Sequence, residues 1–156
     1  MDIKTFNIKD FIDNYRSDIG DDREGRRKDT NEVFTPSEII ESMCAKIDDK
    51  DWADPSKTFL EPTFGNGNIL LYIIWKRLSC GVPVKTVFET LYGTELMPDN
   101  VREAKARIGA LLEKLGEDIT EVNKLIDANL VCTDFFDWDY ENWRPIKKQP
   151  ESIPLF

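Results

Sequence analysis

The 156-residue chain is long enough for one ordinary domain, and 40% apolar residues are enough to bury a core. A net charge of -9 argues against the chain holding duplex DNA unaided, because contacts to phosphates need basic side chains. There is no histidine, and the three cysteines (Cys44, Cys80 and Cys132) are odd in number and widely spaced. We therefore expect reduced thiols, no disulfide and no metal site.

The N-terminal region predicts an arm followed by a single domain. Residues 1–16 space their apolar side chains as a short amphipathic helix does, and residues 17–31 are polar and charged. The basic cluster "REGRRK" is flanked by acids, which favours a solvated segment over a DNA contact. No stretch resembles a membrane span or a secretory signal, so we expect no membrane partner and a cytoplasmic location. The predicted division is an arm at 1–30 and a domain at 31–156.

The first elements of the domain are a capped helix, a strand and a second helix. "TPSE" has the form of a capping box with Thr35 as N-cap, and the helix after it would bury one apolar face. That face comprises Ile39, Ile40, Met43, Cys44 and Ile47. "KTFLE" then predicts a strand over 57–61, and "NILLYIIWKRLSCG" predicts an apolar helix that stops at Gly81.

The remaining elements repeat the order of helix and strand. "VKTVFETL" predicts a helix, a second strand follows over Leu91 to Leu96, and Pro98 starts a helix with apolar residues every three or four positions. "DITEVNKLID" continues the helical pattern, and "NLVCTDFFDW" contains the third strand. This alternation predicts an α/β fold with a parallel, doubly wound sheet.

Three polar segments follow the three strands, at the edge where such a sheet binds its ligand. "EPTFGNGN" carries Gly65 and Gly67, which allow a sharp turn and a close approach of a ligand to the backbone. Taken alone, this segment fits a simple tight turn equally well. Glu95 ends the second strand, where it is either a ribose-binding acid or a surface carboxylate. Asp134 and Phe135 end the third, where they suit the amino group and ring of an adenine, although an aromatic residue there also suits the core.

Four segments in order, "EVFTP", "FLEPTFGNGN", "YGTELMP" and "CTDFFDW", resemble the S-adenosylmethionine-binding motifs of adenine-N6 DNA methyltransferases of restriction-modification systems and phages. The resemblance covers residues 31 to 139. It implies a Rossmann-like class I methyltransferase half-sheet, of about three parallel strands flanked by helices, behind an N-terminal helical arm.

The resemblance also implies which residues bind the cofactor, S-adenosylmethionine or its product S-adenosylhomocysteine. Phe34, Thr35 and Pro36 would line the methionine end. Glu95 would hold the ribose, Leu96 or Met97 would pack on the adenine, and Asp134 and Phe135 would contact its amino group and ring. The amino-acid portion would lie in a cradle formed by Glu61, Pro62, Thr63, Phe64, Gly65, Asn66, Gly67 and Asn68.

The family's catalytic tetrapeptide, Asn or Asp followed by two prolines and an aromatic residue, does not occur in this sequence. The sequence therefore offers no catalytic residue, and we expect DNA methylation only if a missing segment or partner completes the chain. The strand at 57–61 would then have an unpaired side for a second catalytic or specificity chain, or for another copy in a homo-oligomer. The tail "ESIPLF" is a further candidate to cover this side, although Pro154 would interrupt a strand there. One alternative is an inactive decoy or regulatory protein that sequesters the cofactor or inhibits a partner. Another, which no residue pair supports, is cleavage of the cofactor.

Overall fold

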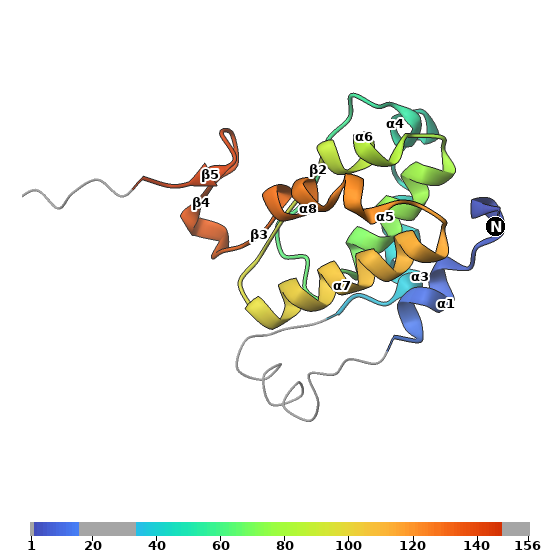
Figure 1. Cartoon of the computed structure of the whole chain (residues 1–156), viewed down its shortest axis with the longest axis horizontal. Helices are drawn as coiled ribbons and strands as arrows, with labels where there is room; N and C mark the ends of the chain where they lie inside the picture. Colours follow the sequence, from blue (N-terminus) through green and yellow to red (C-terminus); the bar gives the residue numbers. More distant parts are fainter. Residues whose placement is uncertain (1, 16–33, 148–156) are drawn as a thin grey trace, which may run out of the picture.

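A computed structural model describes residues 2–15 and 34–147 of the chain (Figure 1). The charged segment predicted at 17–31 lies outside the described residues. The N-terminal part forms a 3-10 helix, η1 (Ile3–Thr5), and a short helix, α1 (Ile8–Asp13). Ile8 and Ile12 of α1 are buried, and α1 packs on α5 and α3, so this segment joins the main core.

The sheet contains three parallel strands, β1 (Phe59–Glu61), β2 (Leu91–Glu95) and β3 (Leu130–Cys132), in the order β1-β2-β3. Glu61 lies opposite Gly93, and Glu95 lies opposite Cys132, so the three strands end close together along one edge. The predicted fold class, a parallel α/β half-sheet flanked by helices, is confirmed.

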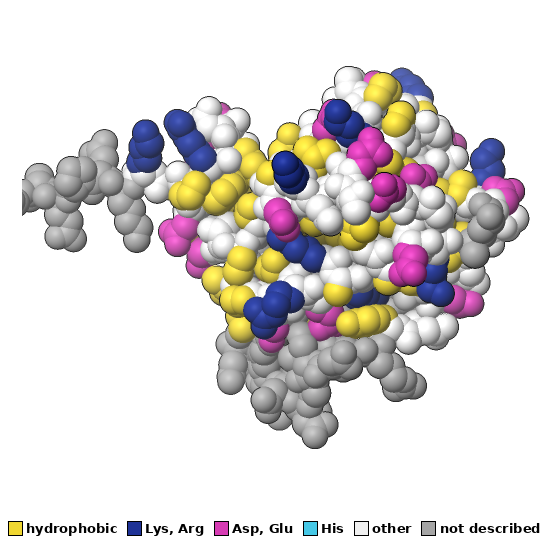
Figure 2. All heavy atoms as spheres, in the orientation of Figure 1, with side chains coloured by type: hydrophobic (Ala, Val, Ile, Leu, Met, Phe, Trp, Pro, Cys, Tyr) yellow, Lys and Arg dark blue, Asp and Glu magenta, His cyan; other side chains and the backbone are white. Residues whose placement is uncertain are grey.

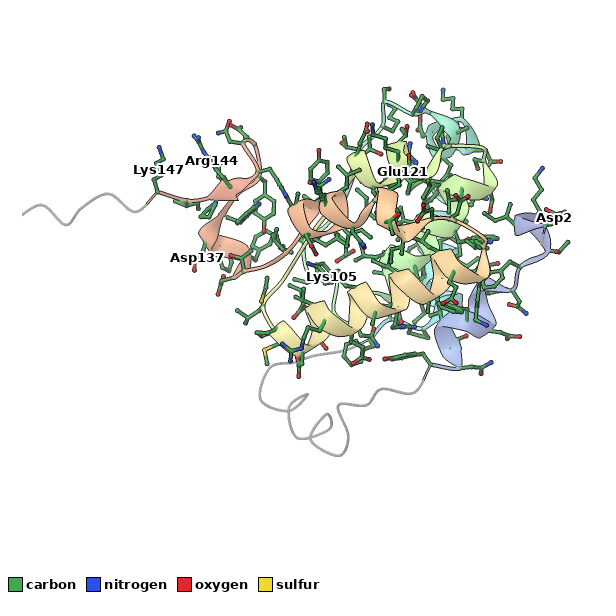
Figure 3. All side chains as sticks on the ribbon, viewed as in Figure 1. Asp2, Lys105, Glu121, Asp137, Arg144 and Lys147 are labelled. Atoms are coloured by element: carbon green, nitrogen blue, oxygen red, sulfur yellow. The ribbon has the colours of Figure 1, made fainter. Side chains whose placement is uncertain are left out.

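Helices connect the strands as the sequence pattern predicted. The chain runs through α3 (Ser37–Cys44) and α4 (Asp49–Ala53) to β1, through α5 (Asn68–Ser79) and α6 (Val84–Glu89) to β2, and through α7 (Pro98–Lys114), η2 (Ile119–Glu121) and α8 (Asn123–Asn129) to β3. Helices α6, α7 and α8 contact β2, whereas α7 and α8 contact β3. In Figure 3 the side chain of Lys105 on α7 points toward α8, where its ammonium lies 3.0 Å from the carboxylate of Asp127.

After β3 the chain forms a short aromatic hairpin. It comprises η3 (Phe135–Asp137) and the antiparallel pair β4 (Trp138–Asp139) and β5 (Arg144–Pro145), which project from the helical body in Figure 1. Trp143 anchors it, because its indole N–H donates to the carbonyl of Ala128 at 2.9 Å and its ring lies 4.8 Å from that of Tyr92. Figure 2 shows hydrophobic side chains gathered around the hairpin and its junction with the body.

The start of α3 differs from the sequence prediction. The helix begins at Ser37, with Pro36 in the N-cap position and no capping bond from a side chain within the segment. Asp13 of α1 replaces the predicted cap, because its carboxylate accepts the backbone N–H of Ser37 at 3.1 Å and the Ser37 hydroxyl at 2.5 Å. The predicted role of Thr35 as N-cap is therefore wrong, since a distant acid takes that role.

The buried face of α3 also differs from the prediction. Ile40 and Cys44 are buried against α1 and α5, whereas Ile39, Met43 and Ile47 are exposed. Ile39 and Met43 lie four positions apart on one exposed face of α3, and Ile47 lies three residues beyond the end of the helix. Burial raises the pKa of the Cys44 thiol to about 11, so this thiol stays protonated at neutral pH.

The amino end of the sheet is held by Arg77 of α5, which is fully buried. Its guanidinium donates to the carbonyl of Asp54 at 2.6 Å, to the carbonyl of Trp52 at 3.3 Å and to the hydroxyl of Thr90 at 2.5 Å. Burial lowers the pKa of Arg77, and these acceptors compensate for the lost hydration. One side chain thus connects α4 with the segments that enter β1 and β2.

Strand β1 pairs with β2 along one edge, and no described strand pairs with its other edge. Phe59 donates its N–H to the carbonyl of Thr90, so Leu60, the next residue, directs its backbone groups to the opposite edge, where the structure describes no strand. The Leu60 side chain is 49% exposed. Beside it, a cavity of about 270 Å³ is lined by Thr58, Phe59, Leu60, Tyr92, Tyr140, Glu141 and Trp143.

In the described ranges, 2–15 and 34–147, no helix has the length and apolar character needed to cross a bilayer. Across the same ranges no cluster of three acidic, cysteine or histidine side chains is arranged to hold a metal ion.

Candidate functional site

The segment from Pro62 to Asn68 connects β1 to α5 and turns at the carboxyl end of the sheet. Thr94 of β2 fixes its first half, because the Thr94 hydroxyl donates to the carbonyl of Pro62 at 2.5 Å and the Thr94 carbonyl accepts the N–H of Phe64 at 3.1 Å. Phe64 itself points into the core and is buried. The turn is therefore bound to the neighbouring strand and contributes backbone groups, rather than the Phe64 ring, to the edge of the sheet.

Two glycines give the turn its shape. Gly65 and Gly67 have φ angles of 56° and 97°, in the left-handed region that glycine adopts without steric cost. A Cβ atom on Gly67 would lie 3.0 Å from the Cβ of Ala104 on α7, which is too close for an ordinary contact. The two glycines thus permit both the sharp reversal and the tight packing of the turn on α7.

Residues 34–35 meet this turn although about thirty positions separate them in the sequence. A Cβ on Gly65 would lie 3.2 Å from the ring of Phe34, so that ring packs directly on the turn. The side-chain amide of Asn68 donates to the carbonyl of Thr35 at 2.8 Å. Pro36 is exposed and follows at the start of α3. Two of the segments predicted to bind the same ligand therefore lie in contact.

Glu95 connects the turn with the end of β2. Glu95 is only 8% exposed, and its carboxylate accepts the N–H of Gly65 at 3.1 Å and the N–H of Met97 at 2.7 Å. The side-chain amide of Asn100 lies 3.4 Å from the same carboxylate. A carboxylate offers about four lone-pair positions, so these donors orient Glu95 and leave acceptor capacity for a further donor.

Glu61 lies at the end of β1 and is partly buried. Burial raises the pKa of its carboxyl, and the N–H of Thr63, which donates to it at 3.2 Å, offsets this effect in part. Thr63 is exposed. Glu61 is thus a carboxylate with few fixed donors, at the point where the chain leaves the sheet.

Asp134 and Phe135 follow β3, next to the end of β2. The carbonyl of Glu95 accepts the N–H of Thr133 at 3.0 Å, which joins the two strand ends. Asp134 is half-buried and caps η3 by accepting the N–H of Phe136 at 2.9 Å. Phe135 is 40% exposed and packs on Tyr140, with ring centroids 5.2 Å apart. Of the two residues after Glu95, Leu96 is exposed and Met97 is half-buried.

The sequence patterns did not identify two buried polar residues of α7 that contact the candidate site. Asn100 and Arg107 lie on the inward face of α7, where Asn100 contacts Glu95 and Arg107 contacts the turn. Neither residue is apolar, so the pattern of apolar residues that predicted α7 does not include them. Their seven-residue separation, parallel to the apolar stripe of the same helix, was the signal that could have identified them.

The described side chains at this edge can bind a polar ligand. Glu61, Glu95 and Asp134 supply acceptors for hydroxyl, amino or ammonium groups, and the turn after β1 supplies close backbone contact. Apolar side chains from Phe34, Leu96 and Phe135 suit a flat ring or an aliphatic chain. Such a set fits a nucleoside that carries a polar, charged extension.

Comparison with known proteins gave one curated relative. The chain is 29% identical over 147 aligned residues to the Type II methyltransferase M.PaeR7I of Pseudomonas aeruginosa. The match covers 84% of this chain and 25% of the relative, so the chain spans about a quarter of the length of the curated protein that it matches. No family model and no solved structure matches. The similarity supports the resemblance of this chain to methyltransferases.

Proposed function

We propose that this chain is the S-adenosylmethionine-binding part of a DNA adenine-N6 methyltransferase. The contact of Phe34 and Thr35 with the turn after β1, and of that turn with Glu95, carries the proposal. These residues come from three separate motifs of the resemblance, and each was assigned to one part of the same cofactor. Their meeting at the carboxyl edge of a parallel sheet supports a common ligand.

The cofactor would lie along this edge. Its amino-acid portion would contact the turn between Pro62 and Asn68 and the carboxylate of Glu61, beside Phe34 to Pro36. Glu95 would accept hydrogen bonds from the ribose hydroxyls. Asp134 would accept from the adenine amino group, and Leu96, Met97 and Phe135 would enclose the ring. The cofactor supplies the methyl group, and these residues bind and orient it.

Methyl transfer to DNA would need a further segment or chain. This sequence lacks the Asn/Asp-Pro-Pro-aromatic tetrapeptide, and its net charge of -9 does not favour DNA contact. No described strand pairs with the outer edge of β1, and Leu60 of this strand is half-exposed, which suits the addition of a strand from the completing partner. The greater length of the curated relative agrees with this division.

Isothermal titration calorimetry with S-adenosylmethionine and S-adenosylhomocysteine tests the proposal. The wild-type chain is expected to bind both. Glu95→Ala and Asp134→Ala should weaken binding, Glu95→Ala by about thirtyfold, because it removes an orienting and accepting carboxylate. The matched control is Glu113→Ala, which removes an exposed acid from α7. Absence of binding of either compound to the wild type would refute the proposal.

The missing tetrapeptide also favours a second candidate, an inactive protein that sequesters cofactor or inhibits a methyltransferase partner. The two candidates differ when the chain is mixed with a separately produced catalytic half and a DNA substrate. Restored methylation selects the first candidate. Normal cofactor binding together with lowered activity of an already complete methyltransferase selects the second.

A further inference from the structure

The guanidinium of Arg107, on α7, lies behind the turn that follows β1. Arg107 is 2% exposed. One of its terminal nitrogens donates both to the carbonyl of Asn66 at 3.0 Å and to the side-chain oxygen of Asn68 at 2.7 Å. The other terminal nitrogen donates to the carbonyl of Ile12, at the end of α1, at 3.2 Å. A single buried cation thus bridges the turn and the N-terminal helix.

The contacts of Asn68 extend this bridge to the segment before α3. Asn68 accepts from Arg107 through its side-chain oxygen and donates to the carbonyl of Thr35 through its side-chain nitrogen. Asp13, next to Ile12, accepts from the backbone and hydroxyl of Ser37. Arg107 therefore belongs to a closed ring of contacts that joins α7, the turn, residues 35–37 and α1.

Beyond the contacts of Thr94 with Pro62 and Phe64, two charged side chains hold different parts of the turn. Glu95 holds Gly65, on the side that leads to β2, whereas Arg107 holds Asn66 and Asn68, on the side that leads into α5. Glycine adopts many backbone conformations, so the contacts around a turn with two glycines determine which one it takes. The second half of the turn, which contains Gly67, depends on Arg107 and on the contact with Ala104.

We infer that Arg107 is a positioning residue for the amino-acid portion of the cofactor, acting through the backbone of Asn66 and the side chain of Asn68. The inference rests on the proposed function. It gives α1 a role in the site, because the guanidinium that donates to the turn also donates to the carbonyl of Ile12. The Cζ atom of Arg107 lies 4.2 Å from the ring centroid of Tyr15. The adenosine portion, bound at Glu95 and Asp134, should not depend on Arg107.

Two ligands separate these roles. S-adenosylhomocysteine contains the amino-acid portion, and 5′-methylthioadenosine carries the same nucleoside and sulfur without it. Both are titrated into the wild type and into Arg107→Lys and Arg107→Met. Lysine keeps the charge but cannot reach the acceptors on both sides of the guanidinium, whereas methionine removes both the charge and the donors. Arg107→Lys is therefore the milder of the two variants. The control, Arg102→Gln, removes an exposed arginine from the same helix.

We expect Arg107→Met to weaken binding of S-adenosylhomocysteine by at least about tenfold and of 5′-methylthioadenosine by less than about twofold. Arg107→Lys should lie between the wild type and Arg107→Met, and Arg102→Gln should change neither affinity. A general loss of folding would lower both affinities together, so the ratio of the two affinities is the measurement. Arg107→Lys supplies this ratio if Arg107→Met does not fold.

An unchanged ratio in both variants, with normal binding to the wild type, would overturn the inference and leave the proposed function standing. Absence of binding of both ligands to the wild type would overturn the proposed function and the inference with it.

Discussion

The two ends of the sheet are each held by a buried arginine, but the two arginines differ in what they hold. Arg77 connects segments that enter strands, and its acceptors are two backbone carbonyls and one hydroxyl. Arg107 connects a turn with left-handed residues to α1, and one of its acceptors is a side-chain amide that also contacts Thr35. We therefore expect Arg77 to contribute mainly to the stability of the fold, and Arg107 mainly to the conformation of the turn after β1. Substitutions at the two ends should separate these properties.

The largest expected effect is at the amino end. Arg77→Met should lower the free energy of unfolding by about 3 kcal/mol, because it removes three hydrogen bonds and leaves the carbonyls of Trp52 and Asp54 without this donor. The affinity of the folded fraction for S-adenosylhomocysteine should not change. Urea denaturation and calorimetry measure the two quantities. A large loss of affinity with unchanged stability would contradict the division between the two ends.

A pair of glycines gives the next largest effect. Gly67→Ala should lower the free energy of unfolding by about 2 kcal/mol, since the new Cβ meets Ala104 and the φ angle is left-handed. It should also weaken cofactor binding. Gly81→Ala, after α5, has a left-handed φ angle and open space around the new Cβ, so it should cost about 1 kcal/mol and leave affinity unchanged. Equal losses of affinity in both variants would contradict this expectation.

Two aspartates make the same local contact in different places. Asp134 and Asp118 each cap a 3-10 helix by accepting the N–H two residues later at 2.9 Å. Asp134→Asn should reduce stability by about 0.5 kcal/mol, and Asp118→Asn by at least as much, because Asp118 also accepts the Thr120 hydroxyl at 2.7 Å. Only Asp134→Asn should weaken cofactor binding, by about fivefold, because it replaces a charged acceptor at a strand end. Calorimetry on both variants makes the comparison, and equal affinities would show that Asp134 serves only η3.

The smallest effect concerns the pH dependence of stability at Glu61. Its pKa is raised by burial, so the folded state binds the proton more tightly than the unfolded state. The favourable contribution is complete below about pH 4.3 and is lost as the pH rises through the raised pKa. Glu61→Gln should therefore gain stability relative to the wild type as the pH rises above about 4.3. Urea denaturation at a series of pH values checks the sign, with Glu121→Gln, which replaces an exposed acid (Figure 3), as the control.

Sequence patterns were sufficient for the order of elements because the periodicities are strong. The apolar run of α5, the intervals of three and four in α7 and the short strands before polar turns each predicted the observed element. Strand ends were also predictable, since parallel strands end at a common edge. The meeting of residues 34–35 with the turn followed only from the family resemblance, because no local pattern connects segments thirty residues apart.

The failures have a common physical cause, which is that tertiary partners decide between local alternatives. Helix α3 has apolar residues on two faces, and packing against α1 and α5 selected Ile40 and Cys44 over Ile39 and Met43. The cap of α3 comes from Asp13, which no pattern within "TPSE" could indicate. A buried arginine cannot be told from a surface arginine in a sequence with many charged residues. The backbone carbonyls that accept its hydrogen bonds come close to it only in the folded chain.

The shortness of β1 has a consequence for self-association. An open strand edge is a template on which copies of a chain aggregate, and long, flat edges are the most hazardous. β1 offers three residues, of which only Leu60 directs its backbone groups outward. So few hydrogen bonds give little affinity for an arbitrary strand, and a stable pairing needs further contacts from a partner of fitting shape. The shortness of β1 thus limits nonspecific aggregation through this edge.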